Sequence, residues 1–333
     1  MRYLILLLVF SFFSEAYGQQ MPLLSQYYKS GPLINPAFSG VNGFMNINAG
    51  YRQQWAGLPN APRTIYLTAN GMIMNPKSDK ISNTLRISDP SLLEEEEVYR
   101  RRDNIKMGWG FYAMSDSYGP FDIFSGFANY AFHYPISRSI YLSLGAGGGI
   151  NNTTIDMNSI EVRDGDNDQT YQNFLANGGT DTRIDVNVGA MLYSDRFFIG
   201  YSIFQLLQEE ILVSDAANAM GLMHQYITAG LRLQTGESMM IIPSIVYRDI
   251  ENLPRTIDYS FKALFNNSFY TGFSYRDDNS IILTTGMTIQ NNYTLGYSYD
   301  YKFSGVNNFN NGSHEIVLGL MLFNDDGTSP YLW

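Results

Sequence analysis

Three histidines, His133, His224 and His314, are the first candidates for chemistry, because imidazole can ligate zinc or transfer protons. They stand far apart in the sequence, and none has a second ligand at the spacing of a zinc site. The chain contains no cysteine, which excludes thiol catalysis, disulfide bonds and thiolate metal ligands. No Gly-x-Ser-x-Gly motif and no Ser/His/acid set stands out, so the sequence does not predict an enzyme.

Carboxylates alternate at Asp164, Asp166 and Asp168, with Glu161 nearby. Side chains at this spacing can surround a hard cation, and calcium prefers such oxygen ligands. The glycine and the bidentate glutamate of a complete calcium loop are missing. Two interpretations therefore stay open, a calcium site and a solvated acidic loop.

The glycine-rich run 145–149 superficially resembles a phosphate-binding loop. It lies within an alternating strand pattern, no helix follows it, and the Lys-Ser/Thr ending is absent. We therefore expect these glycines to mark strand curvature or a close approach of another backbone.

Residues 1–18 have the pattern of a signal peptide. Arg2 gives a positive start, Leu4 to Phe13 are apolar, and small residues precede Gln19, where cleavage is predicted. The apolar stretch is shorter than the roughly 20 residues of a transmembrane helix. A buried N-terminal helix is the alternative, but no polar helical face accompanies the run.

The composition suggests a membrane β-barrel. The net charge of -10 argues against nucleic acid, and charged residues are only 16% while aromatic residues reach 15%. Apolar and polar residues alternate, as in the segments 45–52, 184–192 and 293–303, so each segment has one apolar and one polar or small face. Each is long enough to cross a membrane as a tilted strand.

We predict an all-β fold, a transmembrane antiparallel β-barrel of about 14 strands with short periplasmic turns and longer outer loops. The predicted strands are 44–55, 63–74, 106–116, 121–134, 138–151, 181–193, 196–206, 222–235, 237–249, 254–265, 268–277, 279–290, 292–303 and 312–323.

After the fourth strand, every other link is tight, as at 135–137, 194–195 and 266–267, and the links between them, such as 152–180 and 207–221, are mostly longer. An even number of strands follows if both termini lie on the periplasmic side. A soluble β-sandwich or barrel is the alternative, but it has no reason to sort its loops in this way.

The barrel is expected to span 44–323, after an N-terminal segment 19–43 and before a C-terminal tail 324–333. Segment 19–43 is too irregular for a spanning strand, so it is expected either to plug the lumen or to lie along the periplasmic rim. One periplasmic link, 75–105, is unusually long and contains clustered Glu and Arg residues. It is either a solvated loop or a short helix that docks a periplasmic partner.

Several multi-residue words follow one another in a fixed order and cover nearly the whole mature chain. They resemble the PorP/SprF family of Bacteroidetes outer-membrane proteins, which is associated with type IX secretion and gliding motility. The words are Ser25-Gln26-Tyr27, Ile34-Asn35-Pro36-Ala37-Phe38-Ser39-Gly40, Tyr51-Arg52-Gln53-Gln54-Trp55, Ala61-Pro62-Arg63-Thr64, Tyr193-Ser194-Asp195-Arg196-Phe197-Phe198-Ile199-Gly200 and Gly312-Ser313-His314-Glu315-Ile316.

The resemblance implies an integral outer-membrane protein without catalytic activity or cofactor. It also implies partners, namely periplasmic or peptidoglycan-associated secretion components and a secreted cell-surface protein with a C-terminal sorting domain. The link 75–105 looks atypical for the family.

The signature residues also have a physical interpretation. They are Asn35, Pro36, Gly40, Arg52, Gln53, Gln54, Trp55, His314 and Glu315. The first three are turn residues before the first strand. Arg52 falls on the polar, lumenal face, where a buried charge needs a partner such as Asp185 or Glu315; contact with a ligand is the alternative. Trp55 ends the strand, where an interfacial aromatic side chain is expected.

The sequence is consistent with three functions. The first is an outer-membrane accessory or anchor of type IX secretion, which holds a secreted surface protein on its outer loops. The second is a passive channel or transporter of hydrophobic compounds, because about 14 strands can enclose a lumen. The third is a soluble exported β-protein.

Overall fold

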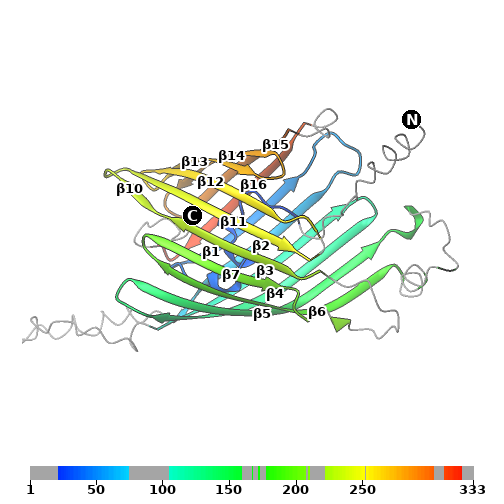
Figure 1. The fold of residues 1–333 in the computed structure, drawn as a ribbon, viewed down its shortest axis with the longest axis horizontal. Helices are drawn as coiled ribbons and strands as arrows, with labels where there is room; N and C mark the ends of the chain where they lie inside the picture. The colour runs from blue at the N-terminus through cyan, green and yellow to red at the C-terminus, as the bar shows by residue number, and fades with distance from the viewer. Residues whose placement is uncertain are drawn as a thin grey trace, which may run out of the picture.

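The computed structural model describes residues 22–74, 105–159, 167, 172, 178–207, 209–210, 222–251, 253–303 and 311–324. The strands form one antiparallel sheet that closes into a 14-stranded barrel (Figure 1). It closes because the first strand, β1 (Met45–Gln53), pairs along its whole length with the last, β16 (Ser313–Leu322). The predicted fold class is confirmed.

The strand boundaries lie within four residues of the predicted ones. The remaining strands are β2 (Arg63–Met74), β3 (Lys106–Tyr118), β4 (Phe121–Pro135), β5 (Ile140–Ile155), β6 (Thr180–Ser194), β7 (Phe197–Phe204), β8 (Glu209–Glu210), β9 (His224–Leu231), β10 (Leu233–Thr235), β11 (Met239–Ile250), β12 (Thr256–Phe265), β13 (Phe269–Arg276), β14 (Ser280–Ile289) and β15 (Tyr293–Lys302). Strands β9 and β10 both pair with β11 and act as one interrupted strand, and the short β8 pairs with β6. Within the described ranges, no helix has both the length and the apolar character needed to cross a membrane.

The two faces of the strands are sorted in the reverse of a water-soluble protein. Inward polar side chains such as Asn48 and Glu315 are at most 2% exposed, whereas outward Ile65 is 59% and Leu318 is 58% exposed. Water-soluble proteins rarely expose continuous apolar surface. A continuous apolar exterior, with buried polar side chains on the inner face of the wall, is the arrangement that a membrane barrel requires.

Most links are sorted by length between the two ends of the barrel, and the exceptions are the long link between β2 and β3 at one end and the short links 119–120 and 277–279 at the other. We call one end the turn end, because it carries the tight links 136–139, 195–196, 236–238, 266–268 and 290–292. Asn266 and Asn267 both have positive φ, 49° and 52°, which matches the twist of hairpin strands and is tolerated by asparagine. The opposite end, the loop end, carries 54–62, 119–120, 156–179, 205–223, 251–255, 277–279 and 303–312.

The N-terminal segment, residues 22–44, lies inside the barrel (Figure 1, dark blue). It forms three 3₁₀ turns, η1 (Tyr27–Lys29), η2 (Gly31–Leu33) and η3 (Pro36–Phe38). Its apolar side chains and inward aromatic side chains of the wall form one buried cluster, so the core of the molecule fills the lumen. The cluster includes Leu24, Tyr27, Leu33, Ile34, Phe38, Val41, Tyr66, Tyr112, Phe127, Tyr193 and Phe198.

Candidate functional site

The turn Asn35-Pro36 fastens the N-terminal segment to the wall. The Asn35 side chain caps η3, where Oδ1 accepts the Ala37 N–H at 2.8 Å. Its Nδ2 donates to the carbonyls of Ala190 on β6 and Tyr201 on β7, at 3.3 and 3.4 Å. Pro36 has no N–H to satisfy and is suited to the first position of the turn. One asparagine thus stabilises the local fold and joins it to two strands.

Glycines allow the backbone of the segment to lie in direct contact with the backbone of the wall strands. Gly40 has a φ of 80°, which favours glycine, and it lies directly against Gly108 of β3. A Cβ on Gly108 would overlap the carbonyl of Ser39, and one on Gly145 of β5 would overlap the backbone of Pro36 and Ala37. The expected close backbone approach is therefore confirmed at Gly145.

Lumenal side chains satisfy the carbonyl groups of the segment. Ser143 Oγ donates to the Ala37 carbonyl at 2.8 Å, and Ser202 Oγ donates to that of Ile34. His133 Nε2 lies 2.9 Å from the Ser39 carbonyl, which can only accept, so Nε2 carries the proton. Its Nδ1 then accepts from Tyr193 Oη at 3.1 Å. His133 thereby has a structural role, as a donor from the wall to the segment.

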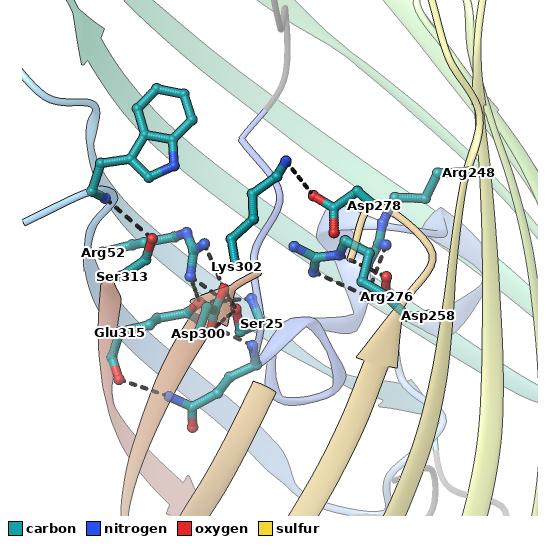
Figure 2. A network of polar contacts seen from close by, with 12 residues as sticks. Ser25, Arg52, Arg248, Asp258, Arg276, Asp278, Asp300, Lys302, Ser313 and Glu315 are labelled. Atoms are coloured by element: carbon teal, nitrogen blue, oxygen red, sulfur yellow. Dashed lines mark hydrogen bonds and ion pairs between the residues drawn. The ribbon is translucent and has the colours of Figure 1, made fainter. Parts of the chain in front are cut away.

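A buried charge network anchors the start of the segment (Figure 2). Arg52 Nη2 lies 2.7 Å from Asp300 Oδ2, and Nη1 lies 3.4 Å from Glu315 Oε2. Nη1 also donates to Ser25 Oγ at 2.8 Å. The Arg52 guanidinium therefore connects three strands, β1, β15 and β16, with the N-terminal segment.

The Glu315 carboxylate accepts hydrogen bonds from both the segment and the wall. The backbone N–H of Ser25 donates to Oε2 at 2.7 Å, and that of Gln26 donates to Oε1 at 3.2 Å. Tyr66 Oη also donates to Oε1, at 2.9 Å. Ser25 Oγ in turn donates to the Asp300 carboxylate, 2.6 Å from Oδ2. Such charge-assisted bonds are the strong ones in a dry interior.

Further charges on β11 to β15 face the same end of the lumen (Figure 2). Asp258 accepts from Arg276 Nε at 2.7 Å and lies 2.9 Å from Arg248 Nη1. Lys302 and Asp278 pair at 2.9 Å and are partly exposed. Together with the Arg52 network, four basic side chains face four acidic ones, so the eight charges balance. The eight are Arg52, Arg248, Arg276, Lys302, Asp258, Asp278, Asp300 and Glu315.

The family model described as "Type IX secretion system membrane protein PorP/SprF" matches residues 16–320. The chain belongs to the PorP/SprF family. Membership associates it with type IX secretion, and the barrel fold together with this family points to the outer membrane. The resemblance inferred from the signature words is confirmed. A search of the curated proteins finds no match to this PorP/SprF chain.

Solved structures similar to this PorP/SprF barrel include the Ralstonia pickettii toluene transporter TbuX and the CymD monoaromatic hydrocarbon channel. TbuX is 9% identical with a TM-score of 0.48, over 87% of this chain and 92% of that chain. CymD is 11% identical with a TM-score of 0.48, over 92% of this chain and 94% of that chain.

Three of the six PorP/SprF signature words meet in the Arg52 network, through Ser25, Arg52 and Glu315. Arg52 contacts Glu315, one of its two expected partners. The other, Asp185 of β6, accepts hydrogen bonds from Asn151 Nδ2 and the backbone N–H of Leu207. Sequence reasoning missed Asp300, although it lies on the polar face of an alternating strand. With its guanidinium held by two carboxylates and 2% exposed, Arg52 has a pairing role in the described structure.

The remaining signature residues lie at the loop end of β1 and β16. Gln54 is buried, and its backbone N–H donates to the Pro62 carbonyl at 2.9 Å. The backbone N–H of Trp55 donates to Ser313 Oγ at 3.1 Å. Gln53 of β1 and His314 of β16 lie opposite each other in the sheet. Gln53 Oε1 accepts a hydrogen bond from Tyr51 Oη, and His314 Nδ1 lies 2.8 Å from Tyr297 Oη. These contacts brace the rim where the strands join.

Two predicted sites fall outside the described residues, namely the carboxylates Asp164, Asp166 and Asp168 and most of the link 75–105. Among the residues that the structure describes, no group of three or more His, Asp or Glu side chains could hold a metal ion. Calcium binding and partner docking by that link stay predictions.

Proposed function

We propose that this protein is a non-enzymatic outer-membrane accessory or anchor of the type IX secretion and gliding system. On this proposal, the loop end holds a secreted cell-surface protein with a C-terminal sorting domain. The turn end contacts periplasmic or peptidoglycan-associated secretion components. The supporting observation is that the chain's own N-terminal segment occupies the lumen, so the two rims are the surfaces left for partners.

Two cavities that lie beside the segment in the described part of the lumen are small. The cavity between Tyr27, Tyr28 and Lys262 measures about 20 Å³, and that between Leu23, Arg52 and Lys302 about 30 Å³. Each is on the scale of a single water molecule. A barrel filled in this way is suited to fixing partners in the membrane, and less suited to passing solutes.

The sorting of the links supports the orientation. In bacterial barrels the short turns face the periplasm and the longer loops face outside. Export through the predicted signal peptide 1–18, cleaved before Gln19, would deliver the chain to the periplasm first. The turn end then faces the periplasm. It carries a polar cavity of about 320 Å³ lined by Asp195, Arg232 and Glu237, a suitable contact for a periplasmic partner.

Deletion of the gene, followed by tracking of the surface protein, tests the anchor. We expect the surface protein to be lost from the cells and to appear in the medium, because it is translocated and then not held. Affinity purification of the tagged barrel from cross-linked native membranes should recover the same surface protein. An unrelated outer-membrane barrel with the same tag is the control.

Two other outcomes would overturn the proposal. The anchor role would be refuted if the surface protein stayed on the cells after deletion of the gene and was absent from the purified complex. If solute uptake were lost at the same time, the alternative of a passive outer-membrane channel or hydrophobic-compound transporter would be favoured.

A further inference from the structure

The described N-terminal segment begins at the loop end of the barrel. Leu23 lines a small cavity together with Trp55, Lys302 and Ser313, all at the loop-end tips of β1, β15 and β16. Ser25 is bonded to Asp300, two positions from the loop-end tip of β15. At Leu23 the chain is therefore already at the loop-end mouth of the barrel.

The segment then descends to the turn end. The Lys29 carbonyl accepts from Asn48 Nδ2 at 2.7 Å, halfway along β1. The Ser39 carbonyl is bonded to His133, two positions from the turn-end tip of β4. Gly40 lies against Gly108, near the turn-end tip of β3, and β1 starts a few residues later. The bonds thus follow the lumen from one end to the other.

We infer that this chain is threaded through its own barrel, so that the residues before Pro22 leave at the loop end. The inference rests on the proposed orientation only for naming that side as the cell surface. The mature N-terminus would then be displayed beside the long loops. An even number of strands is expected when both termini lie on the periplasmic side. With a threaded segment, only the C-terminal end of β16 lies at the turn end.

Threading has a consequence for assembly. The wall fits the segment at Gly108 and Gly145 so closely that even an added methyl group would clash. A segment that fits this closely has no clearance to slide into a barrel whose wall has already closed. The barrel therefore closes around the segment.

Cysteine labelling tests the inference, because the natural chain has no cysteine. The test variant is Gln20→Cys, and whole cells are treated with a membrane-impermeant maleimide before and after permeabilisation. Two matched controls mark the sides: Glu251→Cys in an exposed loop-end link and Glu237→Cys in an exposed turn-end link. We expect Gln20→Cys to be labelled on intact cells, as Glu251→Cys is, and Glu237→Cys only after permeabilisation.

The controls separate threading from orientation. If Gln20→Cys behaves like Glu237→Cys while Glu251→Cys is labelled on intact cells, threading is wrong. If Glu237→Cys is labelled on intact cells and both other variants are hidden, threading holds and the proposed orientation fails. Heat-modifiable migration on gels verifies that each variant is folded, and Pro22→Cys replaces Gln20→Cys if the latter impairs signal-peptide cleavage.

Discussion

Replacement of Arg52 by methionine should release the start of the N-terminal segment. The change removes the cation that faces Asp300 at 2.7 Å and Glu315 at 3.4 Å. At an effective dielectric constant of about 20, unit charges at the shorter of these separations attract by about 6 kcal/mol before desolvation. Removing one partner of a buried pair costs about 3–5 kcal/mol.

For Arg52→Met we expect a loss of stability at the lower end of that range. The adjacent cavity of about 30 Å³ can hold a water molecule, which would solvate the remaining carboxylates in part. A loss of about 3 kcal/mol corresponds to a shift of roughly a hundredfold in the folding equilibrium, since each 1.4 kcal/mol is tenfold.

Two assays measure the effect. Urea unfolding in detergent micelles, followed by tryptophan fluorescence, gives the change in the free energy of unfolding. Trypsin cleavage after Lys29 reports release of the segment, because this lysine lies inside the folded barrel. Arg63→Met, at an exposed arginine of the neighbouring strand β2, is the matched control.

The double variant Arg52→Met, Glu315→Gln tests the cause. Removing one carboxylate together with the arginine should recover part of the loss, and residues of one network usually couple by about 0.5–3 kcal/mol. The reasoning would be refuted if Arg52→Met unfolded like Arg63→Met and resisted trypsin at Lys29. Strict additivity in the double variant would refute the electrostatic cause.

Two further predictions use paired variants. Gly108→Val should keep the N-terminal segment from packing against β3, because the valine side chain would overlap the Ser39 carbonyl. Gly148→Val is the control, because its side chain would meet open space and the variant should fold normally. Trypsin cleavage at Lys29 should occur only in Gly108→Val, and equal resistance of the two variants would contradict the proposed fit. Asp258→Asn leaves two buried guanidinium groups without a carboxylate and should cost about 3–5 kcal/mol. Asp278→Asn breaks a partly exposed pair and should cost about 0–1 kcal/mol in the same urea unfolding, so equal losses would be inconsistent with a buried network.

The strands could be predicted from the sequence because their signal is local. Alternation marks each strand and its faces, and residues such as Asn266-Asn267 mark the turns between them. The same alternation places Arg52 on the lumenal face. Successive side chains of a strand point to opposite faces, so the face of a residue follows from its own strand and does not depend on the neighbouring strands.

The contacts across the lumen could not be predicted in full. Ser25 and Asp300 are 275 positions apart, and their contact depends on the register of every strand between them. Gly108 and Gly145 lie on interior faces like several other glycines. Only the path of the N-terminal segment shows at which of them a side chain would clash. The choice between a plug and a rim position for that segment likewise depends on where its polar groups find partners.

Planar-bilayer recording of the purified protein tests most directly whether the barrel is closed by its own N-terminal segment. The intact protein, shown to be folded by heat-modifiable migration, should insert without a stable conductance. A variant that lacks residues 22–40 should show discrete open steps. A steady ohmic current from the intact protein, as large as that of the shortened variant, would contradict a filled lumen and favour a channel.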